Sequence, residues 1–135
     1  MTHLLDTSAL LAHYLAEPGA TRVQALFEDA TAVTGTSIVA LFEFEIRLHQ
    51  LGVDPATRMA ETNRYRALLS EIVNVDEAVR TEAVRLRTGA TARASAMDTL
   101  IAATASLRGA TLVHRDPHFM VIPAAMLKQE ALPPK

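Results

Sequence analysis

Residues 1–15 have the sequence MTHLLDTSALLAHYL, in which a short apolar run meets an aspartate, two hydroxyl residues and a second apolar run. The first run predicts a buried strand at residues 2–5, and the second predicts a helix from Ser8 to Leu15. Asp6 lies where the strand would become the helix. Its carboxylate could cap the helix by accepting hydrogen bonds from the free amides of the first turn. Alternatively, Asp6 could be one of several carboxylates that the fold brings together.

The remainder of the chain continues to alternate between strand-like and helix-like segments. Such alternation predicts an α/β fold with a mainly parallel sheet. Ligands of these sheets bind beyond the carboxyl ends of the strands, and Asp6 and Asp116 each lie just past a predicted strand. The predicted strands are 2–5, 31–35, 71–75 and 111–114, and the predicted helices are 8–15, 20–29, 38–51, 55–70, 76–87 and 97–108.

The composition restricts the class of protein. With 135 residues, 50% of them apolar, the chain predicts one domain, residues 1–135, with a single core and a frayed tail at 130–135. The absence of cysteine excludes disulfides, a thiolate zinc site and a thiol nucleophile. The net charge of -2 argues against a protein that coats nucleic acid, although an enzyme can still meet RNA locally. No apolar run approaches the roughly 20 residues of a membrane span, and no secretory core is found, so we expect a cytoplasmic protein.

Considered alone, the later aspartates have ordinary structural explanations. Asp98 follows Ser95 by three residues, so this Ser-x-x-Asp could be a capping box at the start of helix 97–108. Asp116 precedes Pro117, and Asp-Pro commonly starts a turn. The five histidines show neither a His-x-x-x-His pair nor another zinc spacing. No Gly-rich phosphate loop and no Gly-x-Ser-x-Gly motif is found either.

Two glutamates in the predicted helix 38–51 must be distinguished. A step of 100° per residue places Glu43 with Arg47 on a narrow polar face, and Glu45 with His49 among apolar residues. Glu43 could be a solvated residue paired with Arg47, whereas Glu45 could bond to His49 at the rim of the core. Periodicity does not decide which of the two glutamates points toward a functional site.

Four segments taken together resemble the PIN-domain family of metal-dependent ribonucleases. They are LLDTSAL, SIVALFEF, MDTLIAATA and LVHRDPHF, and they cover essentially the whole chain in order. In size and layout the chain is similar to the VapC-type toxins of toxin–antitoxin pairs. The resemblance implies a PIN-like three-layer fold, in which helices flank a mainly parallel sheet of about four to five short strands.

The resemblance also implies a set of acidic metal ligands and catalytic residues. Asp6 and Asp98 are the candidates for direct ligands of Mg²⁺, with Mn²⁺ as a possible substitute. Glu43 and Asp116 would act through water or orient the attacking water. The supporting hydroxyls would be those of Thr7 and Ser8. Apart from the resemblance, Arg47 and Arg115 are candidate contacts to substrate phosphates, and the alternative for each is a solvated surface arginine.

The chain departs from the family pattern at two positions. His114 stands two residues before the last aspartate, where the family often has Thr or Ser, and this leaves the role of His114 open. Many members carry another acid just upstream of the residue equivalent to Asp98, where this chain has Arg93, Ala94 and Ser95. The second departure predicts a site of four acids rather than five.

The chemistry explains why such a set would exist. Mg²⁺ and Mn²⁺ prefer oxygen ligands, and converging carboxylates repel one another unless a cation lies between them. We therefore expect a metal-dependent endoribonuclease that acts as a toxin on RNA and is inhibited by an antitoxin protein. The apolar helices 20–29 and 38–51 could also support a homodimer, although the core of a monomer would use the same residues.

Two alternative functions come from other classes. The first is a non-catalytic PIN-like module that binds a protein partner. The second is a phosphotransferase with Asp6 as its nucleophile, but such enzymes usually have a second aspartate where this chain has Ser8.

Overall fold

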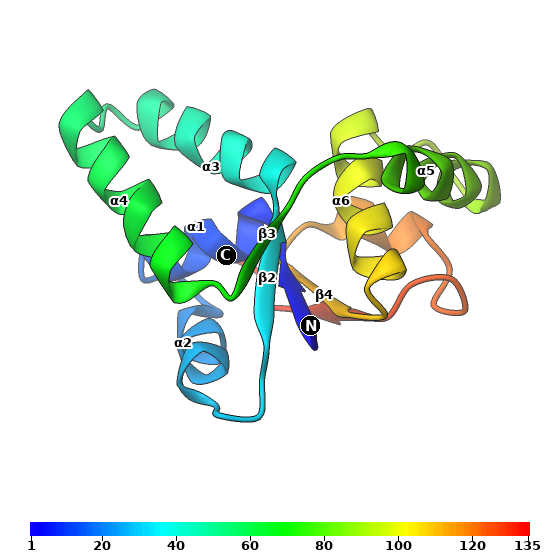
Figure 1. The fold of residues 1–135 in the computed structure, drawn as a ribbon, viewed down its shortest axis with the longest axis horizontal. Coiled ribbons are helices and arrows are strands. Elements are labelled where there is room, and N and C mark those ends of the chain that lie inside the picture. The colour runs from blue at the N-terminus through cyan, green and yellow to red at the C-terminus, as the bar shows by residue number, and fades with distance from the viewer.

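The computed structural model describes residues 1–135 and contains one five-stranded sheet, in which every strand is parallel to its neighbours (Figure 1). The strand order is β3-β2-β1-β4-β5, so the first strand of the chain lies at the centre. This arrangement confirms the predicted α/β fold with a parallel sheet. The strands are β1 (His3–Leu5), β2 (Thr34–Ser37), β3 (Glu71–Val73), β4 (Thr111–His114) and β5 (Gln129–Ala131).

Helices cover both faces of the sheet and complete three layers. The helices α1 to α4 lie on one side of the sheet, and α5 and α6 lie on the other (Figure 1). They are α1 (Thr7–Tyr14), α2 (Ala20–Glu28), α3 (Ile38–Gln50), α4 (Pro55–Leu68), α5 (Glu77–Gly89) and α6 (Ala96–Leu107), with a short 3-10 helix η1 (Pro117–Val121) after β4.

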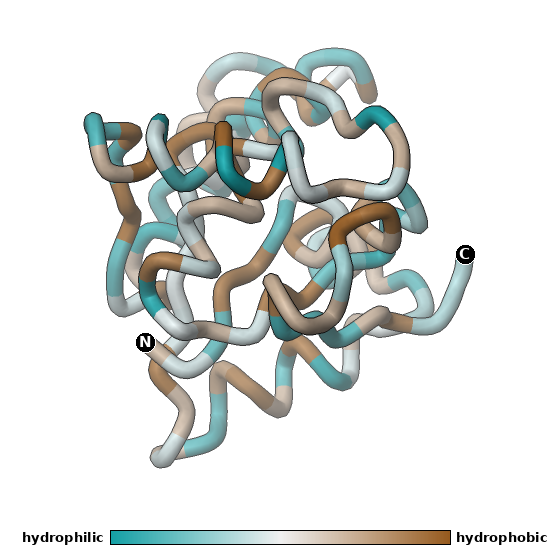
Figure 2. The backbone as a smooth tube through the Cα atoms, turned by 90° about the vertical axis from the view of Figure 1, so that its right-hand side faces the viewer, coloured by the Kyte–Doolittle hydropathy of each residue, from teal (hydrophilic) through white to brown (hydrophobic).

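Alternation along the two central strands divides the core into two clusters. Leu4 and Leu112 are fully buried under α5 and α6, whereas Leu5 and Val113 are fully buried under α1 to α4. Strands covered on both faces are expected to carry consecutive apolar residues, and the pairs Leu4-Leu5 and Leu112-Val113 meet this expectation. Apolar and hydrophilic residues alternate along the whole tube in Figure 2, and no helix combines the length and apolarity that a membrane crossing requires.

The second strand lies a few residues later than predicted. The apolar pair Ala32-Val33 suggested a strand at 31–35, but β2 contains the polar sequence TGTS. Its hydroxyl residues tolerate burial because they find partners: Thr36 Oγ1 donates to the Leu5 carbonyl at 2.7 Å, and Ser37 Oγ accepts from the first turn of α3. Local hydrophobicity does not reveal these partners.

The tail expected to fray at 130–135 is instead partly structured. β5 includes Glu130 and Ala131 and pairs with β4, and the amide of Leu132 donates to the His114 carbonyl at 2.7 Å. Leu132 is only 6% exposed and packs against Gly19. Gly19 has a φ of +100°, and a Cβ atom there would lie 3.0 Å from the Leu132 Cβ. The strand is short and polar, so its order depends on these distant contacts.

The packing of this segment gives a direct test. Leu132→Ala should lower the free energy of unfolding by roughly 2–5 kcal/mol, because it empties a buried site. Leu107→Ala, on a residue that is 45% exposed, should change it by less than about 0.5 kcal/mol. Urea denaturation followed by circular dichroism measures both. An equal, negligible effect of the two substitutions would mean that the tail is frayed in solution.

Candidate functional site

Four carboxylates meet in one cavity at the carboxyl edge of the sheet. Asp6 directly follows β1, Asp116 follows β4, Glu43 lies in α3 just beyond β2, and Asp98 lies in the first turn of α6. The cavity has a volume of about 180 Å³. The residues that line it are Asp6, Thr7, Ser8, Leu11, Glu43, Arg47, Asp98 and Asp116.

Asp6 both caps a helix and faces this cavity. It is only 3% exposed, and its Oδ2 atom accepts hydrogen bonds from the Ser8 amide at 2.9 Å and the Ser8 hydroxyl at 2.6 Å. These bonds make Asp6 the N-cap of α1. The two explanations of Asp6 are therefore compatible, because Oδ2 makes both bonds and the carboxylate still lines the cavity.

The two hydroxyl residues after Asp6 connect the elements around the cavity. Ser8 Oγ donates to Asp6 and accepts from the backbone amide of Arg115 at 2.8 Å, which links α1 to the loop after β4. Thr7 Oγ1 lies 3.3 Å from Glu43 Oε1 and 3.2 Å from the Ala40 carbonyl, which links α1 to α3. Both hydroxyls therefore hold carboxylates in place.

The structure separates the two glutamates of α3. Glu43 is partly buried and lines the carboxylate cavity. Glu45 lines a different cavity, between α3 and α4, together with Arg58 and Arg66. Glu43 is therefore the glutamate of this helix that joins the other three acids.

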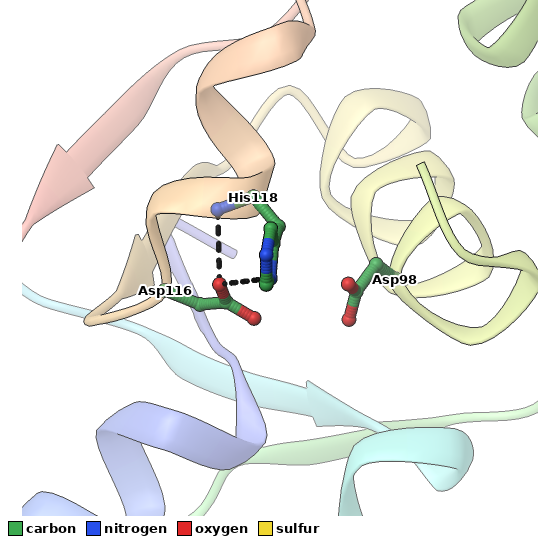
Figure 3. A group of neighbouring side chains, drawn as sticks. All are labelled: Asp98, Asp116 and His118. Atoms are coloured by element: carbon green, nitrogen blue, oxygen red, sulfur yellow. Dashed lines mark hydrogen bonds and ion pairs between the residues drawn. The ribbon is translucent and has the colours of Figure 1, made fainter. Parts of the chain in front are cut away.

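Asp98 and Asp116 lie opposite each other, with His118 beside them (Figure 3). The capping of α6 is done by Ser95, whose Oγ accepts from the Asp98 amide at 3.1 Å. Asp116 Oδ1 accepts from the His118 amide and lies 2.9 Å from His118 Nδ1. One possible ligand atom from each of Asp98, Asp116 and His118 lies within 4.8 Å of the others.

His118 was not among the residues predicted for the site. Its position two residues after Asp116, within the turn that Pro117 begins, was the available signal. The His-x-x-x-His pattern and the other zinc spacings do not include His118, because its neighbours in the site are carboxylates.

His114 has a structural position beneath this turn. It is 1% exposed, and its Nδ1 accepts from the Asp116 amide at 3.2 Å while its Nε2 lies 2.9 Å from Gln129 Oε1. Since Nδ1 is the acceptor, the proton belongs on Nε2 and the ring is neutral, and burial lowers the pKa of His114 accordingly. Gln129 Nε2 also donates to the carbonyls of Phe119 and Ile122 in and after η1, each at 3.1 Å.

The two arginines proposed to contact substrate differ in position. Arg47 lines the carboxylate cavity, and its guanidinium donates to Gln50 at 3.0 Å. The guanidinium of Arg115 is directed to the α1–α2 turn, where it bonds to Glu17 at 2.8 Å and to the Pro18 carbonyl at 3.2 Å. Only the backbone amide of Arg115 contacts a residue of the cavity.

Three of the carboxylates that line the cavity are held in conditions that disfavour their charge. Burial raises the pKa of Asp6 to about 7, and the charge of Asp98 contributes to the rise, although the Ser8 hydrogen bonds oppose it. Burial also raises the pKa values of Glu43 and Asp98, with added repulsion from Asp98 and Asp116 respectively. A divalent cation would remove this repulsion, and an oxygen-rich donor set suits Mg²⁺ or Mn²⁺. The residues present therefore fit such an ion.

A larger cavity lies elsewhere, between α5 and α6. It has a volume of about 530 Å³, its lining includes Arg80, Arg87 and Arg93, and no carboxylate lines it. It offers no group for metal binding or acid–base chemistry, so the smaller acidic cavity is the candidate active site.

Comparison with known families and structures gives a consistent result. The family model for the PIN domain matches residues 3–124. The structure of VapBC2 from Rickettsia felis, bound to a DNA fragment from its promoter, has a TM-score of 0.78 at 21% identity, covering 98% of this chain and 100% of that chain. DNA-bound VapBC from Salmonella typhimurium has a TM-score of 0.78 at 18% identity, covering 97% of this chain and 98% of that chain.

A third structure is a toxin from Mycobacterium tuberculosis. VapC20, which cleaves the sarcin–ricin loop, has a TM-score of 0.69 at 16% identity, covering 88% of this chain and 93% of that chain. At such identities the likeness establishes a shared fold. No match was found among curated protein sequences.

The raised carboxylate pKa values predict how stability changes with pH in the absence of divalent cations. A carboxyl whose folded pKa exceeds its unfolded value stabilises the fold when protonated, and this contribution is lost as pH rises. For Asp6 the loss runs from pH 3.8 to about 7 and amounts to at most about 4 kcal/mol. Asp6→Asn should therefore stabilise the protein relative to wild type more at pH 8 than at pH 4.

Urea titrations in a chelating buffer over this pH range measure the difference. Asp29→Asn is the matched control, because Asp29 is exposed and its pKa is lowered by bonds from Thr31. The control should retain the wild-type decline between pH 5 and 7. A decline that is the same in Asp6→Asn and wild type would rule out a buried, destabilised Asp6.

Proposed function

Because this chain belongs to the PIN-domain family, we propose that it is a Mg²⁺- or Mn²⁺-dependent endoribonuclease that hydrolyses RNA phosphodiester bonds. The observation that carries the proposal is the convergence of Asp6, Glu43, Asp98 and Asp116 in one cavity. The four come from separate elements, and burial makes the ionisation of Asp6, Glu43 and Asp98 costly. A set of charges this unfavourable for folding supports the proposal that the cavity binds a cation.

Each carboxylate has a proposed task. Asp6 and Asp98 would hold the ion directly, and Glu43 would hold its water ligands and orient the attacking water. Asp116 would bind the ion either directly or through one of those waters. When bound, the cation lowers the pKa of a water molecule and neutralises charge that develops on the phosphate. Thr7 and Ser8 keep the Glu43 and Asp6 side chains in position through the hydrogen bonds described above.

Arg47 is the proposed contact to the substrate. It lines the same cavity, and its guanidinium bonds only to the neutral Gln50 side chain, from which a phosphate can displace it. Arg115 is a weaker candidate, because a phosphate would have to replace its ion pair with Glu17. The RNA substrate is supported by the similarity in fold to VapC20, a toxin that cleaves the sarcin–ricin loop.

The proposed biological role is that of a toxin controlled by an antitoxin. Its support is the similarity in fold to the VapBC structures from Rickettsia felis and Salmonella typhimurium. An antitoxin side chain such as arginine would suit the acidic cavity. Phe42 and Ile46 on α3 are 57% and 41% exposed, and they offer apolar area beside Glu43 for a partner or a second copy of the chain. We further propose that the protein works in the cytoplasm as a homodimer.

The catalytic proposal predicts that removing either direct ligand stops the reaction. Asp6→Asn and Asp98→Asn should each lower RNA cleavage by at least about 100-fold, because even indirect partners of a metal often contribute 10–100-fold. Each variant should also abolish growth arrest on expression. Glu45→Gln is the matched control, since Glu45 lines another cavity, and it should retain cleavage.

Gel assays of RNA cleavage with Mg²⁺, with Mn²⁺ and with chelator measure the effect, and circular dichroism verifies that the variants fold. Cleavage that persists in both folded aspartate variants would exclude this active site. Absence of cleavage and of cation binding in the wild type would favour the alternative, a non-catalytic module that binds a protein.

A further inference from the structure

His118 lies against the carboxylates without being one of the four acids of the site. Figure 3 shows its imidazole ring between Asp116, on the same turn, and Asp98, on α6. We propose that His118 supplies a nitrogen ligand to the cation held by Asp98 and Asp116. This inference rests on the proposed function, because it concerns the same ion, and it changes the donor set from all-oxygen to mixed oxygen and nitrogen.

The distances support a shared ion. His118 Nδ1 lies 2.9 Å from Asp116 Oδ1, and one ligand atom from each of the three residues lies within 4.8 Å of the others. Ligands bound to one ion at about 2.0–2.4 Å can be separated by no more than about twice that length. The three groups are therefore close to the arrangement that a single cation requires.

The backbone geometry of the η1 turn fixes the position of His118 beside Asp116. Asp116 caps η1 by accepting from the His118 amide at 2.9 Å, and Pro117 occupies the first position of the turn. Two buried or partly buried side chains support the turn. His114 accepts a hydrogen bond from the Asp116 amide, and Gln129 donates to two carbonyls in and after η1. Asp116 and His118 are thus presented together as a preorganised pair.

Solvent access distinguishes His118 from the other histidine of this loop. The His118 side chain is 80% exposed, so an ion can reach its ring nitrogen from solvent. His114 is buried, and its Nδ1 already accepts a hydrogen bond from Asp116. Of the two, only His118 has a ring nitrogen that a cation could share with Asp98.

The contact between His118 and Asp116 could also be a simple hydrogen bond or ion pair, and the two roles predict different effects. If His118 only paired with Asp116, its removal would leave cation binding unchanged or strengthen it, because a group that competes for the carboxylate would be lost. If His118 is a ligand, its removal weakens binding. The sign of the change in affinity therefore separates the roles.

A nitrogen ligand also affects which ion is preferred. Imidazole suits transition metals, whereas Mg²⁺ strongly prefers oxygen. The mixed donor set should favour Mn²⁺ and Co²⁺ over Mg²⁺. Removing the imidazole should then reduce Mn²⁺ and Co²⁺ affinity while changing Mg²⁺ affinity little.

The test uses the untagged full chain with Mn²⁺ as the probe, at about pH 8, where a free imidazole is mostly neutral. Electron spin-echo envelope modulation detects a nitrogen coordinated to Mn²⁺, and ¹⁵N-histidine labelling identifies it as imidazole. Wild type should show this coupling and His118→Ala should lack it. The matched control is His49→Ala, on an exposed residue of α3, and it should keep the coupling.

Calorimetry completes the test. His118→Ala should weaken Mn²⁺ binding about tenfold, a loss typical of a partner in a metal site, and Mg²⁺ binding by much less. Mn²⁺ that binds in an Asp98-dependent manner without nitrogen coupling, or more tightly in His118→Ala, would overturn the role of His118 alone. A wild type that binds no Mn²⁺, or binds it equally well after Asp6→Asn and Asp98→Asn, would overturn both this inference and the metal site itself.

Discussion

The parallel pairing of β1 with β4 is the constraint on which the candidate site depends. Their register sets Leu5 opposite Val113, and the amide of Asp6 then donates to the Val113 carbonyl at 3.0 Å. A slip of one residue would exchange the faces of Leu4 and Leu5 and expose each to the wrong cluster of the core. Apolar residues outside the cavity therefore determine that Asp6 and Asp116 emerge side by side.

At this edge of the sheet, burial and charge repulsion between carboxylates destabilise the fold. Asp6 is buried deeply enough that its pKa rises to about 7, and Asp98 adds its own charge nearby. The hydroxyls of Thr7 and Ser8 offset part of this cost and also fix the geometry. A cation relieves the remainder, so on our proposal the ion contributes to stability as well as to chemistry.

Sequence patterns predict the architecture and much of the site, and their failures share a physical cause. Strand–helix alternation was sufficient for the parallel sheet, and the aspartate after the first strand was recognisable as a candidate. Periodicity could not decide between Glu43 and Glu45, since that choice depends on where α1 packs. The polar strand β5 and the position of His118 beside Asp98 were not predicted. Both depend on contacts between residues far apart in the chain or on a turn that distant side chains support. Local signals do not contain that information.

The bonds from Gln129 to the η1 turn have a consequence for the order in which the protein is made. Synthesis proceeds from the N-terminus, and earlier parts of a chain can begin to fold first. All four carboxylates precede Gln129, so each has left the peptidyl-transferase centre before the residue that braces the Asp116 turn has been added. A ribosome-bound chain that stops short of β5 would hold Asp116 on a turn that lacks the support of Gln129. On our proposal, vectorial synthesis thereby delays assembly of the metal site until residues beyond the last of the four acids have been added.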